Sequence, residues 1–218
     1  MIAVLPPRSK FIPPDPRPMT YSDYTVGLVE KGFGITMRQA ELFAGVKALT
    51  PPGWLADSLG RGMQLALISE KARSEFIVGP VLLASRELCQ NRFAIYSGHR
   101  LDVDPQSGLA GECDFLLAET EPLPELHSPL ATIVEAKKND IESGLGQCAA
   151  QMVGARRFNE IEGQPPRPIF GCITTGEVWF FLKLEDQTLW VDRRRYLINE
   201  VGSILAAIQA MFDHGPPS

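Results

Sequence analysis

The stretch 133-IVEAKKND-140 places four charged side chains directly after two β-branched apolar residues. Ile133 and Val134 are typical of a buried strand. Because residues i and i+2 of a strand point to the same face, Glu135 and Lys137 are predicted to project together while Ala136 points away. The stretch therefore predicts a strand that ends by presenting a carboxylate and an ammonium group on one face.

A second apolar strand is predicted upstream, in 111-GECDFLLAE-119, with Asp114 near its start. If the two strands pair, Asp114 lies beside Glu135, and two close carboxylates are relieved by a shared proton or a divalent cation. Oxygen ligands, including the backbone carbonyl of Ala136, favour Mg²⁺ or Mn²⁺ over zinc. Lys137 would orient or deprotonate a water, or stabilise charge on a phosphate. This set predicts metal-assisted phosphodiester hydrolysis.

The segments around this hairpin predict an α/β fold. Helical periodicity over residues 55–88 indicates two helices or one bent helix, with Gly79-Pro80 ending or kinking that region. Further helices are predicted over residues 142–161 and 200–212, and a short helix capped by Thr36 is predicted to follow that residue. Short segments rich in β-branched and aromatic residues predict the strands, and together they indicate a mixed sheet flanked by helices. Their predicted positions are residues 92–98, 100–103, 112–118, 131–136, 168–175, 177–184 and 188–196.

Composition and length indicate the organisation of the chain. With 218 residues and 44% apolar content, the chain is long enough to bury one substantial core. Residues 1–35 are predicted to form a Pro-rich arm, and residues 36–218 a single domain.

Several classes of protein are disfavoured by the sequence. No run of 18 apolar residues occurs and no signal-peptide pattern is present, so a cytoplasmic protein without a membrane span is expected. Four scattered cysteines without a CxxC spacing predict buried free thiols rather than a zinc site or disulfides. A net charge of −5 argues against non-specific coating of nucleic acid. This negative charge does not exclude a nuclease, because a bound metal restores positive charge locally.

An Asp opening one strand and a Glu-X-Lys ending the next resemble the signature of the PD-(D/E)XK nuclease superfamily. Four segments resemble the nuclease domain of type I restriction-enzyme motor subunits, over roughly residues 65–185. They are 69-SEKARSEFIVGPVL-82, 111-GECDFLL-117, 135-EAKKNDIESGLGQCAAQM-152 and 168-PIFGCITTGEVWFFLKL-184. The resemblance implies a restriction-endonuclease-like mixed sheet with an α-β-β-β-α-β core.

The same resemblance implies roles for individual residues. Asp114 and Glu135 would be the metal ligands, with help from the helix glutamate Glu70. Lys137 would be the catalytic lysine, and Gln147 the supporting polar residue that positions water or the scissile phosphate.

The chain departs from the family pattern at three points. Cys113 stands where the motif's name has proline, and Gln151 stands four residues after Gln147, where the family usually has an aromatic. No GxxxxGK[ST] phosphate loop occurs, so a stand-alone relative of the nuclease part is expected. On the preceding helix Glu75 competes with Glu70, and Glu112 shares the face of Asp114.

Three functions follow as expectations. The first is a divalent-metal-dependent nuclease acting on DNA. The second is a non-catalytic binding or assembly module that retains the nuclease fold. The third is a toxin or phosphodiesterase acting on RNA or another substrate. A homodimer is expected by analogy with enzymes that cut both strands, and the absence of a recognition domain suggests a separate specificity or motor subunit.

Overall fold

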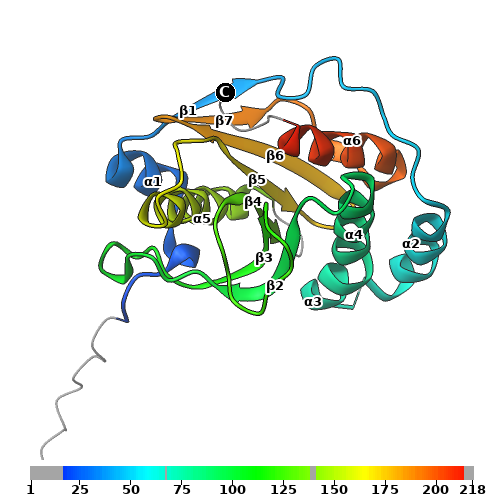
Figure 1. Ribbon diagram of the computed structural model, residues 1–218, viewed down its shortest axis with the longest axis horizontal. Coiled ribbons are helices and arrows are strands. Elements are labelled where there is room, and N and C mark those ends of the chain that lie inside the picture. Colours follow the sequence, from blue (N-terminus) through cyan, green and yellow to red (C-terminus); the bar gives the residue numbers. More distant parts are fainter. Residues whose placement is uncertain (1–16, 67, 138–140, 214–218) are drawn as a thin grey trace, which may run out of the picture.

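A mixed sheet between two layers of helices forms the body of the protein, as the computed structural model shows for residues 17–66, 68–137 and 141–213 (Figure 1). The sheet has eight strands in the order β1-β7-β6-β5-β4-β3-β2, with β8 paired to β6. This confirms the predicted α/β class. The strands are β1 (Thr36–Ala40), β2 (Ala94–Arg100), β3 (Glu112–Ala118), β4 (Leu130–Ala136), β5 (Ile169–Thr174), β6 (Val178–Glu185), β7 (Thr188–Asp192) and β8 (Tyr196–Leu197).

Six α-helices are found in the described part of the chain, joined by shorter helical turns. The α-helices are α1 (Val26–Phe33), α2 (Gly53–Ala66), α3 (Glu70–Arg73), α4 (Gly79–Leu88), α5 (Ile141–Ile161) and α6 (Val201–Phe212). The turns are the 3₁₀ segments η1 (Tyr21–Asp23), η3 (Pro105–Ser107) and η4 (Ile198–Glu200), and the π-helical segment η2 (Ser74–Val78).

The centre of the fold is a three-stranded meander followed by a crossover. Strands β2, β3 and β4 pair antiparallel in sequence order, and α5 then returns the chain so that β5 runs parallel to β4. A parallel neighbour requires such a crossover, usually a helix. The elements α4, β2, β3, β4, α5 and β5 therefore follow one another in the predicted α-β-β-β-α-β order.

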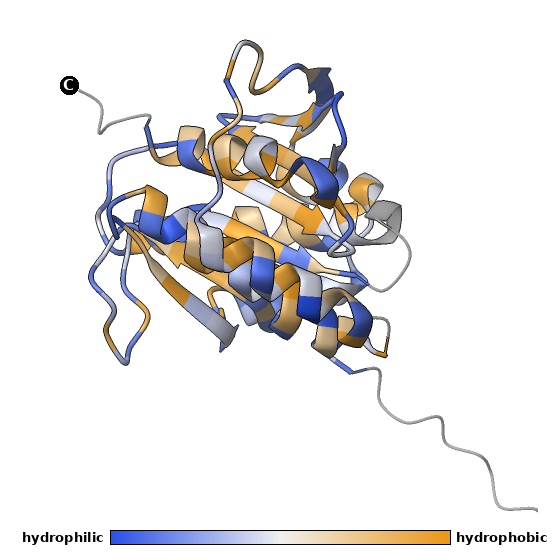
Figure 2. Cartoon of the chain, turned by 90° about the vertical axis from the view of Figure 1, so that its right-hand side faces the viewer, coloured by the Kyte–Doolittle hydropathy of each residue, from blue (hydrophilic) through white to orange (hydrophobic). Residues whose placement is uncertain are grey.

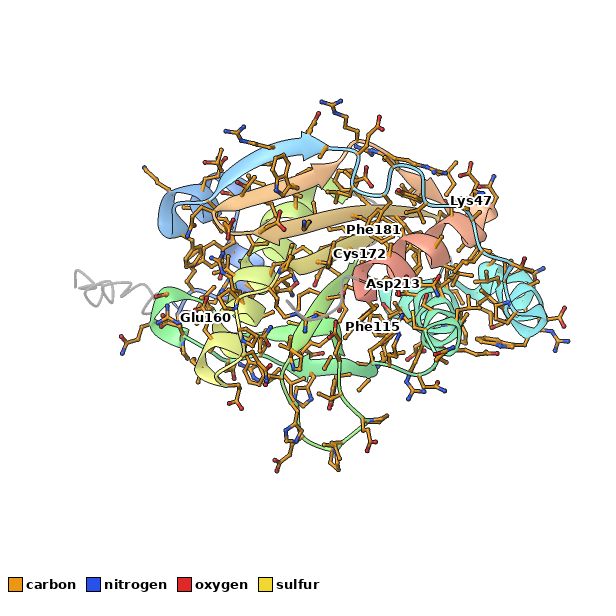
Figure 3. All side chains as sticks on the ribbon, turned by 45° about the horizontal axis from the view of Figure 1, so that its top comes forward. Lys47, Phe115, Glu160, Cys172, Phe181 and Asp213 are labelled. Carbon is orange, nitrogen blue, oxygen red and sulfur yellow. The ribbon has the colours of Figure 1, made fainter. Side chains whose placement is uncertain are left out.

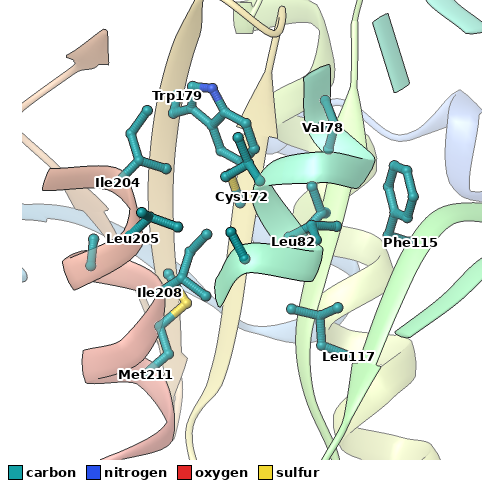
Figure 4. Close-up of a cluster of buried hydrophobic side chains, with 14 of the residues drawn as sticks. Val78, Leu82, Phe115, Leu117, Cys172, Trp179, Ile204, Leu205, Ile208 and Met211 are labelled. Carbon is teal, nitrogen blue, oxygen red and sulfur yellow. The ribbon is translucent and has the colours of Figure 1, made fainter. Parts of the chain in front are cut away.

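Each face of the sheet has its own apolar core. Helices α1 and α5 cover one face, here called the α5 face, while α2, η2, α4 and α6 cover the opposite face, the α4 face. On the α4 face, Phe115 lies beside Leu82 of α4, and Trp179 lies beside Ile204 of α6 (Figure 4). The strands are mostly hydrophobic in Figure 2, as expected for a sheet buried on both faces.

The predicted helical region over residues 55–88 is divided into two parts. Helix α2 is a separate helix that packs against the second helical run, in which α3, η2 and α4 follow one another. Gly79-Pro80 does not end this run but begins α4 directly after the π-helical segment, where Pro80 occupies a first-turn position. Proline is tolerated there because the first-turn N–H groups have no partner within the helix.

The helix predicted after Thr36 is wrong. Residues Thr36–Ala40 form β1, an edge strand that pairs parallel with β7. The free hydrogen-bonding edge of β7 is available only in the folded sheet, and it outweighs a weak local helical preference. Further along the same segment, Phe43 packs into the core of the α4 face.

The N-terminal arm predicted over residues 1–35 is also wrong for its described part. Residues 21–33 form η1 and α1 and pack on α5, and Tyr21 and Val29 are each only 1% exposed. These apolar side chains cover the outer side of α5, which would otherwise expose small apolar residues to water. Residues 1–16 of the predicted arm, and Lys138 after the motif, lie outside the described residues.

A membrane span was not expected from the sequence. Among the described residues, every helix is too short or too polar to cross a bilayer.

Candidate functional site

The pairing of β3 with β4 brings the predicted carboxylates together. The register pairs Phe115 with Val134 and Leu116 with Ile133, so one further step places Asp114 opposite Glu135. Directly opposed residues of an antiparallel pair have Cβ atoms about 4.5–5.5 Å apart. Asp114 and Glu135 therefore lie side by side where β3 begins and β4 ends (Phe115 of β3 is labelled in Figure 3).

Lys137 and Glu135 form an ion pair that Gln147 bridges. The Lys137 Nζ lies 2.9 Å from Glu135 Oε1 and donates to Gln147 Oε1 at 2.8 Å. The Gln147 Nε2 in turn donates to Glu135 Oε1 at 2.5 Å. The structure thus brings together three predicted site residues, two from the end of β4 and one from α5 above it.

Gln151 is a further member of this group that sequence reasoning did not assign to the site. It is fully buried, and its Nε2 donates to Glu135 Oε2 at 2.9 Å. Gln147 and Gln151 are four residues apart, so they lie on one side of α5 one turn from each other. That spacing was the available signal, but the sequence does not show that this side faces Glu135.

Asp114 is bound to the backbone of the next strand. The Ala136 N–H donates to Asp114 Oδ2 at 2.7 Å. In an extended strand the N–H and C=O of one residue point to the same neighbouring strand, so the Ala136 carbonyl also faces the side of Asp114. The role of the Ala136 carbonyl as an additional oxygen ligand stays a prediction.

Burial and mutual repulsion act on both carboxylates. Burial, and next the charge of Asp114, raise the pKa of Glu135 to about 7, although Lys137 acts to lower it. The pKa of Asp114 is also raised, chiefly by burial and further by Glu70 and Glu112, against the Ala136 N–H and Lys137. Each carboxylate disfavours ionisation of the other, and burial adds to this effect.

A cavity of about 520 Å³ opens on Asp114 from the α4 face. It lies between the run α3–η2–α4 and the adjoining ends of β2 and β3. Its lining residues are Glu70, Lys71, Ser74, Glu75, Gly79, Ser97, Gly98, Glu112, Asp114 and Phe115. The cavity gives solvent and small ligands a path to Asp114, whereas Glu135 is not part of its lining.

Glu70 lies on the wall of this cavity rather than in the hydrogen-bonded group around Glu135. Its charge acts on Asp114, whereas Glu75 lies 4.0 Å from Lys71, its partner on the helix. Of the two helix glutamates, Glu70 is the one whose charge raises the pKa of Asp114. The role of Glu70 as a metal ligand stays a prediction.

A metal ion requires several ligand atoms close together. Within residues 17–66, 68–137 and 141–213, no three His, Cys, Asp or Glu side chains gather closely enough to hold a metal ion. Asp114, Glu135 and the Ala136 carbonyl nevertheless offer oxygen ligands only. Mg²⁺ is commonly bound through one or two carboxylates and keeps several waters, so oxygen ligands suit Mg²⁺ or Mn²⁺ better than a structural zinc. That these groups bind a metal stays a prediction.

Comparisons with known proteins add no family to this description. No protein-family model matches the chain, and no curated protein matches it in sequence.

Proposed function

We propose that this protein is a divalent-metal-dependent nuclease of restriction-endonuclease-like fold that hydrolyses phosphodiester bonds, with DNA as the leading substrate. One observation carries the proposal: the Lys137 ammonium group is ion-paired with Glu135 at 2.9 Å, beside Asp114, at the end of the central hairpin. The α-β-β-β-α-β order of the surrounding elements supports it.

The residues of the site divide the chemistry among them. Asp114 and Glu135, with the Ala136 carbonyl, would hold Mg²⁺ or Mn²⁺. The ion, when bound, supplies positive charge that polarises the phosphate. Gln147 keeps the Lys137 and Glu135 side chains in contact through its two amide atoms.

Lys137 is suited to act on water or phosphate. An ammonium group has three N–H donors. Among the described residues, Glu135 and Gln147 accept from two of them. The side chain is 19% exposed, so the third donor can reach a water or a phosphate oxygen. A positioned proton donor or acceptor of this kind contributes about 10²–10⁴-fold to a rate.

The charge balance supports a requirement for metal. The chain carries a net charge of −5, and the cavity at Asp114 is lined by Glu70, Glu75 and Glu112 as well. A polyanionic substrate would be repelled from this surface without a cation to offset the carboxylates. Cleavage is therefore expected to stop when the divalent ion is removed.

The setting of the enzyme belongs to the same proposal. All four cysteines are free and buried, which suits a reducing, cytoplasmic compartment. Cutting both strands of a duplex calls for two sites, so a homodimer or a separate specificity or motor subunit is proposed as the partner.

A cleavage assay with a matched lysine control tests the proposal. Purified protein is incubated with plasmid, linear duplex, single-stranded DNA and RNA, in Mg²⁺, in Mn²⁺ and in a chelator. Lys137→Ala is expected to lose about 10²–10⁴-fold in rate. The control is Lys183→Ala, which breaks another strand ion pair, Lys183–Glu185 at 2.7 Å on β6, and is expected to cleave normally.

The outcomes separate the candidate functions. Cleavage that needs no metal, or that Lys137→Ala leaves unchanged, would contradict this mechanism. Binding of nucleic acid without cleavage under all conditions would support a non-catalytic module. Cleavage confined to RNA would keep the mechanism and change the substrate class.

A further inference from the structure

Gln151 lies in the middle of α5, directly over the buried carboxylate of β4. Its side chain is 0% exposed, and its Nε2 donates to Glu135 Oε2 at 2.9 Å. Its Oε1 is buried without a hydrogen-bond partner. The amide therefore makes one polar contact among the described residues, and that contact is to the predicted metal ligand.

The two oxygens of Glu135 are held from different directions. Lys137 and Gln147 contact Oε1, whereas Gln151 contacts Oε2. Without the donor on Oε2, the carboxylate would be held by these groups at Oε1 alone. The Gln151 hydrogen bond to Oε2 therefore opposes rotation of the Glu135 carboxylate toward Lys137 and keeps its plane in one orientation.

Packing alone does not account for a glutamine at this position. A buried acceptor without a partner costs about 1–3 kcal/mol in a typical protein. A methionine or leucine of similar volume would fill the same space between α5 and the sheet without that cost. The reverse orientation of the amide would aim its oxygen at the Glu135 carboxylate, so the observed orientation is the one that serves Glu135.

We propose that Gln151 is a positioning residue that holds the Glu135 carboxylate in the orientation required to bind a divalent cation. The inference rests on the proposed function, because it takes Glu135 as a metal ligand. It adds a residue at which the chain departs from the family it resembles. Partners that orient a metal ligand typically affect metal affinity by about 10–100-fold when they are replaced.

The test compares two buried amides on the same helix. Gln151→Met keeps the volume and removes the donor. The control is Asn159→Leu: Asn159 is 3% exposed, also lies on α5, and bonds the backbone N–H and C=O of Leu130 at the other end of β4, each at 2.8 Å. Both substitutions remove amide contacts between α5 and β4, but of the two replaced side chains only Gln151 contacts Glu135.

Two quantities are measured on the full chain. The first is the dissociation constant for Mn²⁺, from electron paramagnetic resonance or calorimetry. The second is the Mg²⁺ concentration at half-maximal cleavage, separated from the rate at saturating Mg²⁺. Gln151→Met is expected to weaken Mn²⁺ binding and to raise the half-maximal Mg²⁺ concentration, each by about 10-fold. Asn159→Leu is expected to bind Mn²⁺ as the wild type does, even where its melting temperature falls further.

Each other outcome overturns a definite part of the inference. If the wild type binds Mn²⁺ and Gln151→Met binds it equally well, Gln151 has no positioning role while the proposed function stands. Equal weakening in both variants also removes that role, because the effect then comes from helix packing. A wild type that binds no Mn²⁺ overturns the metal site and the role of Gln151 together. If Gln151→Met does not fold, Gln151→Asn, which keeps the amide but is too short to reach Glu135, replaces it with the same expectations.

Discussion

At the scale of single residues, Glu135 is the unusual group in this protein. It is a carboxylate with a 4% exposed side chain, on a buried strand whose other residues are apolar apart from Thr132, and a second carboxylate lies opposite. Three polar side chains contact it, yet burial and Asp114 still raise its pKa to about 7. A group in this state links the stability of the fold to pH.

Glu135 is expected to make the protein less stable as pH rises from about 4.5 to about 7. In that window the native state keeps the Glu135 proton while the unfolded state has lost it, so the unfolding free energy falls with pH. The contribution is fully present below the ordinary carboxyl pKa and is lost as pH passes the raised one. The slope from this group is at most about 1.4 kcal/mol per pH unit. Denaturant unfolding of the wild type and Glu135→Gln across this range measures it, without added metal.

Glu185→Gln is the control for this measurement. Glu185 also pairs with a lysine on its own strand, at 2.7 Å, but its side chain is 42% exposed. Its substitution is expected to leave the pH slope as in the wild type. A Glu135→Gln variant with the same slope as the wild type would contradict the raised pKa.

At the scale of elements, α5 packs closely on the N-terminal segment η1–α1, and this contact is here called the seam. Gly146 of α5 lies against the backbone of Tyr24 and Thr25, and a Cβ at this glycine would fall 2.3 Å from the Tyr24 carbonyl oxygen. Only glycine permits so close an approach. Gln147 follows Gly146 along α5, so a displacement of the helix at this seam is expected to move the bridging amide as well.

Gly146→Ala is expected to destabilise the protein by about 1–3 kcal/mol, because the added methyl group forces the N-terminal segment away from α5. The variant should also lose part of its metal affinity through displacement of Gln147. Thermal or urea unfolding and Mn²⁺ titration check the two effects.

Gly60→Ala provides the contrasting helical glycine. Gly60 lies in α2, and a Cβ added there would meet no described atom within 4 Å beyond its own helix backbone and chain neighbours. Alanine is the better helix former, and this variant is expected to gain about 0.5–1 kcal/mol. Equal effects at the two glycines would contradict the close packing of the seam.

At the scale of the whole molecule, the two cores enclose every cysteine. Cys89, Cys113, Cys148 and Cys172 are all free and at most 1% exposed. Burial raises the pKa of the Cys89 thiol to about 11, and it raises the pKa values of the other three thiols as well. Since the thiolate is the reactive form, all four are expected to be inert while the fold is intact.

A thiol-modification assay checks this expectation. At pH 8 the native protein should react with a disulfide reagent only at the rate of global unfolding. In denaturant, all four thiols should react at once. Rapid modification of any cysteine in the native protein would contradict the closed cores.

The elements that could be predicted from the sequence are those whose signals are local. The central strands and α5 were predicted close to their observed bounds because their apolar periodicity is local. The common face of Glu135 and Lys137 followed from the alternation of side chains in a strand, and the 2.9 Å ion pair agrees with it. The elements missed, β1 and α1, depend on partners far along the chain, namely β7 and α5.

The sequence by itself determined which chemical groups end β4 and that a hairpin can bring Asp114 beside them, because strand geometry has a period of two residues. Only the tertiary structure decided how those groups are held. The side of α5 that faces β4 makes Gln151 a contact of Glu135, and the packing of η1 and α1 against α5 closes the α5 face. Helix orientation is set by packing against the sheet as a whole, and no short stretch of sequence contains that information.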